Sequence, residues 1–253
     1  GVAQWIGARW SVITGGIGVI PGATMAERRL HFIEHLDHIR TLLMYEPRGH
    51  AAMSGAILQP PTRHDADFGV LYIEVSGLLP MCGHGTIGTI TISIQEKLIK
   101  PRTPGIVRME VPAGVVIAEY RCGLPEAQQL KSSETKIESV KFTNVPSFVH
   151  SFELTAQCPE LGELVFDVAF GGNFYAIVDP QKNFKGIQNY GAEKLIGWSR
   201  ELRKNINAKY EFVHPEDQTI NYCTHILWAG VVLDKHSTSR NAVFYGDKAI
   251  DRS

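Results

Sequence analysis

The stretch from Gly69 to Gly88, GVLYIEVSGLLPMCGHGTIG, constrains the fold of this chain more than any other. It opens with β-branched and aromatic residues from Val70 to Val75, which predict a strand. Gly83 and Gly85, on both sides of His84, then predict a tight turn at which the backbone can approach a ligand. The residues from Thr86 to Leu98 predict a helix directly after this turn. The stretch therefore places Cys82 close to the start of a helix.

A thiol at a helix N-terminus lies at the positive end of the helix dipole, which lowers its pKa and raises its thiolate fraction near neutral pH. We therefore expect Cys82 to be a reactive acid/base with a pKa below that of a free cysteine. The N–H groups of the turn are suited to hold a carboxylate or a phosphate. A buried structural cysteine beside a tight turn is the alternative that this pattern leaves open.

Length and charge exclude several classes of protein. The 253 residues suffice for one large or two medium domains. The net charge of −1 comes without a basic stripe, so we expect no nucleic acid and no anionic membrane as a partner. No apolar run reaches membrane-spanning length and no signal peptide is recognisable, so we expect a cytoplasmic protein.

The cysteine and histidine patterns argue against a metal site. The four cysteines lie far apart in the chain and form no C-x-x-C pair: Cys82, Cys122, Cys158 and Cys223. This spacing argues against structural zinc and against a dense disulfide framework, and free thiols fit a reducing compartment. His31, His35 and His38 lie near one another on a predicted helix, but no carboxylate or cysteine motif accompanies them. A solvated polar face is the favoured interpretation, and we expect no metal.

The remaining elements follow from periodicity and turn residues. Thr24 and Glu27 form a predicted capping box that opens a helix ending before Pro47. Its apolar residues are expected on one face: Leu30, Ile33, Leu36, Ile39 and Leu43. Strands are predicted at residues 11–20 (interrupted by a glycine turn), 52–58, 107–111, 115–120, 139–143, 148–154, 164–169, 174–178, 222–227 and 241–245, a helix at 191–204, and a hairpin tip or exposed loop at 128–136.

Three motifs, EPRGH at 46–50, MCGHGTIG at 81–88 and AFGGNF at 169–174, resemble the proline racemase family. The resemblance extends with few gaps from about Ile13 to the last residue. It implies an α/β (α+β) fold of two pseudo-symmetric halves of the diaminopimelate epimerase type, each a curved, mostly antiparallel sheet around a central helix. We expect the first half at 1–145 and the second, incomplete at its C-terminus, at 146–253.

The resemblance also implies the chemistry, which is inversion at Cα of an amino acid by two cysteines on opposite faces of the substrate, without pyridoxal phosphate or any other cofactor. Cys82 matches the first cysteine. The second belongs to a DRSPCGTGT motif, of which Asp251-Arg252-Ser253 are the first three residues. By this resemblance the second cysteine would follow Ser253, and we expect the 253 residues alone not to complete the inversion.

Six residues match substrate-binding positions of the family: Ser54, Gly83, His84, Gly85, His225 and Asp251. The resemblance gives the glycine-rich turn the substrate carboxylate, places His84 and Asp251 beside the ring nitrogen, and lets Ser54 and His225 favour 4-hydroxyproline over proline through polar contacts to the ring hydroxyl. On pattern alone, His225 is a structural histidine on the same strand face as Cys223 and Leu227, and Asp251 is an exposed loop residue.

The implied function is therefore epimerisation of trans-4-hydroxy-L-proline to cis-4-hydroxy-D-proline by a homodimer whose partner is this small substrate. Proline racemisation and dehydration of trans-3-hydroxyproline are alternatives within the family. A catalytically incomplete protein that binds an imino acid or an interaction partner is an alternative of another class. A cysteine hydrolase is less favoured, because no histidine and Asn or Asp follow Cys82 in a recognisable arrangement.

Overall fold

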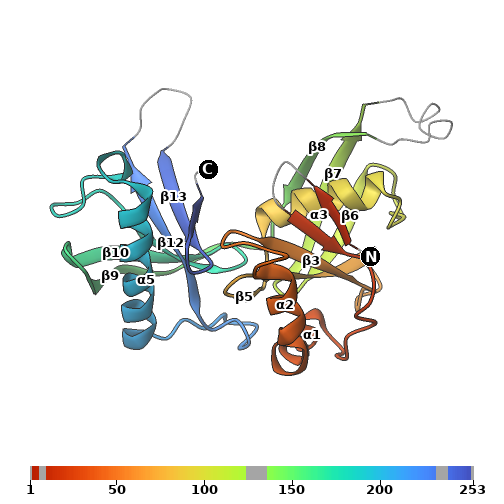
Figure 1. The fold of residues 1–253 in the computed structure, drawn as a ribbon, viewed down its shortest axis with the longest axis horizontal. Helices are drawn as coiled ribbons and strands as arrows, with labels where there is room; N and C mark the ends of the chain where they lie inside the picture. Colours follow the sequence, from red (N-terminus) through yellow and green to blue (C-terminus); the bar gives the residue numbers. More distant parts are fainter. Residues whose placement is uncertain (1, 6–9, 124–135, 232–238, 252–253) are drawn as a thin grey trace. The chain divides into compact units, whose positions relative to one another are not determined.

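The structure is a computed structural model that describes residues 2–5, 10–123, 136–231 and 239–251. The loop predicted at 128–136 lies outside these residues except for Lys136. The chain forms two compact units, Gly1–Val145 and Pro146–Ser253 (Figure 1). Each unit contains a mostly antiparallel sheet with helices against it, which confirms the mixed α/β class. No helix within the described ranges is long and apolar enough to cross a membrane.

The sheet of the first unit has eight strands among the described residues, in the order β1-β2-β3-β4-β6-β7-β8, with β5 paired to β4. The strands are β1 Val2–Trp5, β2 Trp10–Ile13, β3 Ser54–Gln59, β4 Phe68–Glu74, β5 Gly77–Leu79, β6 Ile106–Val111, β7 Gly114–Cys122 and β8 Ile137–Thr143. Only β2–β3 and β4–β6 are parallel pairs in this description. The strand predicted at 11–20 ends early, since Gly16 and Gly18 adopt positive φ and turn the chain.

A helical crossover connects the parallel strands β2 and β3. It consists of α1 Met25–His31, the π-helical η1 Phe32–Leu36 and α2 Asp37–Met44. Thr24 is the N-cap as predicted, and its hydroxyl accepts the N–H of Glu27 at 3.1 Å. The Glu27 carboxylate accepts the N–H of Ala23 at 2.8 Å, so the capping box closes one residue further out than expected.

The predicted apolar face of this crossover is wrong in its first half. Leu30 and Ile33 are each 42% exposed, whereas Met25, Phe32 and Met44 are buried against β3 and β4. A π-helical turn contains more residues than an α-helical turn. Residues spaced for an α-helix of 3.6 residues per turn therefore do not all lie on the buried side of this crossover.

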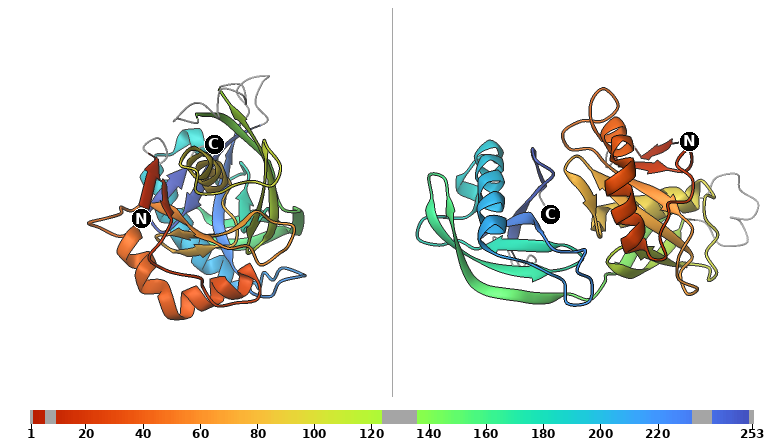
Figure 2. Two further views of the ribbon diagram at one scale, coloured as in Figure 1. Left: turned by 90° about the vertical axis from the view of Figure 1, so that its right-hand side faces the viewer. Right: turned by 90° about the horizontal axis from the view of Figure 1, so that it is seen from below.

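Helix α3, Gly83–Gln95, begins three residues before the predicted start and ends before Leu98. Most of its residues after Gly83 are buried, and the predicted helix is confirmed. It contacts β1, β2 and β3 near one end of the sheet and β8 at the other. The sheet therefore curls around α3 (Figures 1 and 2).

The sheet of the second unit has six described strands in the order β14-β13-β12-β11-β10-β9. They are β9 Phe148–Cys158, β10 Gly162–Phe170, β11 Phe174–Val178, β12 Cys223–Gly230, β13 Arg240–Tyr245 and β14 Ala249–Asp251. The short η2 Ile187–Asn189 and the long α5 Ala192–Lys209 lie between β11 and β12. Leu195, Trp198 and Leu202 of α5 are buried, as their spacing predicted.

The two units repeat one topology. In each, an antiparallel pair leads into a parallel pair joined by a helical crossover, followed by an antiparallel strand and a short hairpin strand. The sequence β1-β2-crossover-β3-β4-β5 thus corresponds to β10-β11-α5-β12-β13-β14. This repeat is the pseudo-symmetry that the fold class predicted.

Candidate active site

Cys82 is the N-cap residue of α3 and has an extended backbone. Its Sγ accepts a hydrogen bond from the N–H of Gly85 at 3.4 Å. Its carbonyl oxygen accepts both the N–H and the hydroxyl of Thr86, each at 2.9 Å. The half-buried thiol therefore lies where the N–H groups of a 13-residue helix point.

Two buried hydroxyl groups fix this N-cap from behind. The Thr86 hydroxyl donates its only proton to the carbonyl oxygen of Cys82. The Tyr72 hydroxyl, 3.0 Å away, therefore donates its proton to the Thr86 hydroxyl oxygen. Burial raises the pKa of Tyr72, which keeps the phenol a neutral donor. The backbone that carries the thiol is thus tied to β4 through side chains with almost no solvent contact.

Glycines allow α3 to approach the sheet closely. A Cβ on Gly85 would lie 2.3 Å from the Trp10 ring and 2.9 Å from the Tyr72 ring, and a Cβ on Gly88 would lie 3.2 Å from Trp10. The Trp10 indole N–H also donates to the Thr89 hydroxyl at 3.2 Å. Sequence reasoning missed this contact, although two glycines three residues apart in a buried helix are a usable signal for close packing.

Ser54 is the first residue of β3 and is half-buried. It pairs with Trp10 on the parallel β2 and with Glu74 on the antiparallel β4. Paired residues share a sheet face, and the Trp10 ring lies against α3, so the Ser54 side chain points to the α3 face as well. The first unit thus brings Ser54 to the face that carries Cys82, Gly83, His84 and Gly85.

His225 lies in β12 at 5% exposure, beside a β-bulge. Phe174 of β11 pairs with Cys223, but the next residue, Tyr175, pairs with His225. The extra residue turns the His225 side chain away from the face of Cys223, so the predicted shared face with Cys223 is wrong. His225 instead lies on the face opposite α5, because Trp228, of the other parity, donates its indole N–H to Ser199 of α5.

The imidazole of His225 is neutral and closely held. Burial, with a smaller contribution from the charge of Arg203, lowers the pKa of His225 to about 3. The ring stacks on Tyr175 with centroids 4.7 Å apart and an interplanar angle of 20°. Its Nδ1 lies 2.6 Å from the hydroxyl oxygen of Thr224. The neutral ring carries one proton, on either Nδ1 or Nε2, and Nδ1 has Thr224 as its hydrogen-bond partner.

Asp251 is the last residue of β14 and is half-buried, so the exposed loop position expected from pattern alone is wrong. It pairs with Val243, which pairs with Leu227. Leu227 lies two residues beyond His225 on β12, so Asp251 is on the sheet face of His225, in the neighbouring cross-strand row.

The other three cysteines lack the setting of Cys82. Burial raises the pKa of Cys158 and of Cys223 to about 12, and burial together with Glu138 raises the pKa of Cys122. All four cysteines lie in the described part of the chain, and none forms a disulfide. Among the described residues, no group of three His, Cys, Asp or Glu side chains could hold a metal ion.

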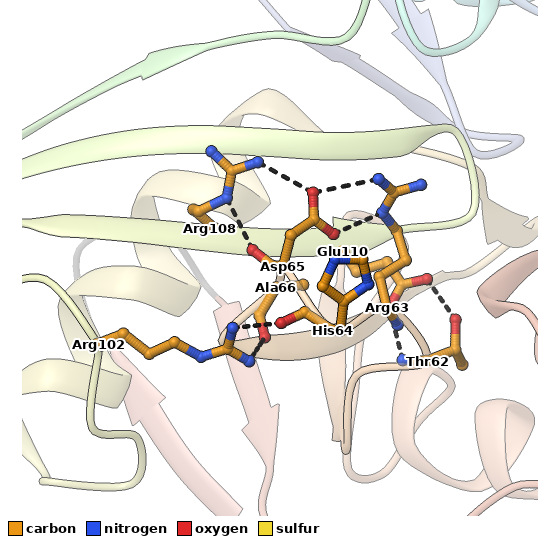
Figure 3. A network of polar contacts seen from close by, with 8 residues as sticks. All are labelled: Thr62, Arg63, His64, Asp65, Ala66, Arg102, Arg108 and Glu110. Atoms are coloured by element: carbon orange, nitrogen blue, oxygen red, sulfur yellow. Dashed lines mark hydrogen bonds and ion pairs between the residues drawn. The ribbon is translucent and has the colours of Figure 1, made fainter.

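A charged cluster in the first unit is structural (Figure 3). Hydrogen bonds from Arg63 and then from Arg108 lower the pKa of Asp65, while Arg102 donates to the backbone of His64 and Ala66. Buried Glu110 accepts from Thr62 and from the backbone of Arg63. The arginines of the cluster bond to carboxylates or carbonyl oxygens of the first unit. The cluster therefore anchors the loop before β4 to β6 and to the turn that precedes β6.

Comparisons with known proteins all indicate one family. The family model described as proline racemase matches residues 5–253. The chain is 57% identical over 243 residues to the 4-hydroxyproline 2-epimerase of Spirosoma linguale and 56% identical over 242 residues to that of Paracoccus denitrificans, in each case over 96% of this chain and 70% of the relative. The solved hydroxyproline epimerase of Agrobacterium vitis, with bound trans-4-hydroxy-L-proline, superposes with a TM-score of 0.82 at 27% identity, over 96% of this chain and 69% of that one.

Proposed function

This chain belongs to the proline racemase family, and from that premise we propose that it is a cofactor-independent 4-hydroxyproline 2-epimerase. The reaction interconverts trans-4-hydroxy-L-proline and cis-4-hydroxy-D-proline. The observation that carries the proposal is the position of Cys82 as N-cap of α3, in a chain 57% identical to a protein of that name.

Inversion at Cα requires a base that removes a weakly acidic proton from one face and an acid that delivers a proton to the other. Cys82 is the proposed base, because its sulfur accepts an N–H of the helix start, a contact that favours the thiolate. We assign the opposite face to a second acid/base, which by the family resemblance would follow Asp251-Arg252-Ser253.

The negative charge that develops on the substrate during proton removal needs fixed positive dipoles. Gly83, His84 and Gly85 are the first three residues of α3, at the positive end of its dipole. We therefore assign the substrate carboxylate to the backbone of this turn, as the family resemblance implies. Asp251 is the proposed partner of the cationic ring nitrogen.

Ser54 and His225 are the proposed specificity residues. Both offer polar atoms on the sheet face opposite the crossover helix, and a site built to bond a hydroxyl group discriminates strongly against a substrate that lacks it. Proline, which lacks the ring hydroxyl, is therefore the disfavoured substrate.

The experiment incubates the protein with trans-4-hydroxy-L-proline in D2O and follows the solution by NMR. We expect loss of the Cα proton signal, and growth of the cis diastereomer only when the second acid/base is present as well. Cys82→Ser is expected to lower the exchange rate by at least about 100-fold, whereas Cys122→Ser, at the end of β7, is the matched control that keeps it. Undiminished exchange in Cys82→Ser would exclude Cys82 as the base.

The same assay with other substrates separates the alternatives. Racemisation of proline at an equal or higher rate would indicate a proline racemase, and loss of water from trans-3-hydroxyproline would indicate a dehydratase.

A cytoplasmic location, supported by the thiol state of the four cysteines, and a homodimer, supported by the family resemblance, complete the proposal. Cell fractionation and sedimentation analysis test them.

A further inference from the structure

We infer that Thr224 is a positioning residue that sets the tautomer of His225, so that the imidazole presents a hydrogen-bond acceptor to the ring hydroxyl of the substrate. The substrate part of this inference rests on the proposed function. The tautomer part is a property of the second unit alone.

The β-bulge brings Thr224 to the imidazole. In a regular strand, neighbouring side chains point to opposite faces, and the hydroxyl of one residue lies away from the ring of the next. Thr224 is the extra residue between the pairs Phe174–Cys223 and Tyr175–His225. Its Oγ1 therefore reaches the Nδ1 of His225 at 2.6 Å.

Helix α5 holds the bulge in place from behind. Arg203 donates to the carbonyl of Thr224 at 3.2 Å and to that of Gly246 at 2.8 Å. Asn207 bonds both backbone groups of Cys223, accepting its N–H at 2.9 Å and donating to its carbonyl at 3.0 Å. Two side chains of α5 thus hold the backbone that carries the Thr224 hydroxyl.

The hydrogen-bond directions follow from counting protons. The Thr224 hydroxyl donates its single proton to the carbonyl of Phe174 at 3.4 Å. It can then bond the imidazole only as an acceptor, which requires the proton of His225 to be on Nδ1. If the proton were on Nε2, the hydroxyl would have to leave the Phe174 carbonyl, and one of the two bonds would be lost.

An imidazole with its proton on Nδ1 carries a lone pair on Nε2. Stacking on Tyr175 holds the ring plane, so this acceptor has one fixed direction. It bonds a substrate hydroxyl, which donates a proton, but it gains nothing from the ring methylene of proline or from fluorine, which donates none. Thr224 therefore supports selection by a group that does not itself touch the substrate.

The first test measures the tautomer by ¹⁵N NMR of the imidazoles in the protein without substrate, with the His225 signals assigned through His225→Gln. We expect the Nδ1–H form in the parent protein and in Thr224→Ser, and a shift towards Nε2–H in Thr224→Val, which has the same shape without the hydroxyl. An Nε2–H form in the parent protein overturns the inference, even if Thr224→Val fails to fold. An unchanged tautomer in a folded Thr224→Val does so as well.

The second test compares kcat/KM for exchange of the Cα proton with deuterium, which needs only the base on one face, in trans-4-hydroxy-L-proline, trans-4-fluoro-L-proline and L-proline. In the parent protein we expect the fluoro compound to react like proline. In Thr224→Val we expect the hydroxyproline-to-proline ratio to fall about 10-fold, mainly through KM, and Thr224→Ser to restore it. A fluoro compound that matches hydroxyproline, or a ratio unchanged in Thr224→Val, overturns the inference. If the parent protein turns over none of the three compounds, the proposed function fails, and the tautomer measurement alone decides the role of Thr224.

Discussion

Ser54 and His225 occupy equivalent positions in the two sheets. Each lies at the start of the second strand of a parallel pair, where Ser54 pairs with Trp10 and His225 with Tyr175. Each of these strands then pairs with an antiparallel strand that leads into a short hairpin strand. The two side chains therefore lie at equivalent positions of the repeated topology, on the sheet face opposite the crossover helix of their own unit.

This equivalence predicts that both residues contribute to substrate choice. We expect Ser54→Phe combined with His225→Leu to lower the ratio of kcat/KM for hydroxyproline over proline by at least about 10-fold, because the double variant removes both proposed polar partners of the ring hydroxyl. Steady-state assays with the two substrates measure the ratio. A double variant with the ratio of the parent protein would show that selection arises elsewhere.

The close contact of α3 with the sheet predicts that Gly85 does not tolerate a side chain. The Cβ in Gly85→Ala would overlap the buried Trp10 and Tyr72 rings, so we expect the free energy of unfolding to fall by about 3 kcal/mol. Gly197→Ala in α5, where nothing lies within 4 Å of the new Cβ, is the matched control and should gain up to about 1 kcal/mol. Urea unfolding compares them, and equal stabilities would contradict the packing described.

The settings of the cysteines predict selective alkylation. At pH 8 we expect iodoacetamide to modify Cys82 first, because Cys158 and Cys223 are buried thiols with pKa values of about 12. Peptide mass spectrometry after short reaction times identifies the modified site, and a urea-unfolded sample, in which all four react, is the control. Modification of Cys158 or Cys223 before Cys82 would remove the argument for a reactive N-cap thiol.

Buried His225 predicts a pH-dependent stability. Its folded pKa of about 3 lies below the value of about 6.5 for an unfolded histidine. The unfolded chain therefore binds a proton in this window that the folded chain does not, and stability rises with pH between these values.

Between pH 5 and pH 7 this one group contributes about 2 kcal/mol of the change in unfolding free energy. Denaturant unfolding at the two pH values should show a correspondingly smaller change in His225→Gln. An identical change in the variant and the parent protein would mean that His225 is not buried as a neutral group.

The helix start at Cys82 was predictable from local sequence. Glycines, a cysteine and the residues after them specify an N-cap and a helix through backbone preferences that act within a few residues, which is why Cys82 was expected at a helix start. The Trp10–Gly85 contact, in contrast, joins residues far apart in the chain. Only the packing of α3 on the sheet shows why position 85 has no room for a side chain.

The sequence by itself determined most of the strands and the main helices, and its motifs indicated the family and the six residues proposed as substrate positions, because these depend on short-range propensity and motif. Tertiary structure alone decided the π-helical turn that exposes Leu30 and Ile33, the strand position of Asp251 and the bulge that separates Cys223 from His225. The reason is physical: register and bulges are set by hydrogen bonds to neighbouring strands and by side chains such as Arg203 and Asn207, which hold the bulged backbone from another element. A period-2 reading of one strand contains no information about them.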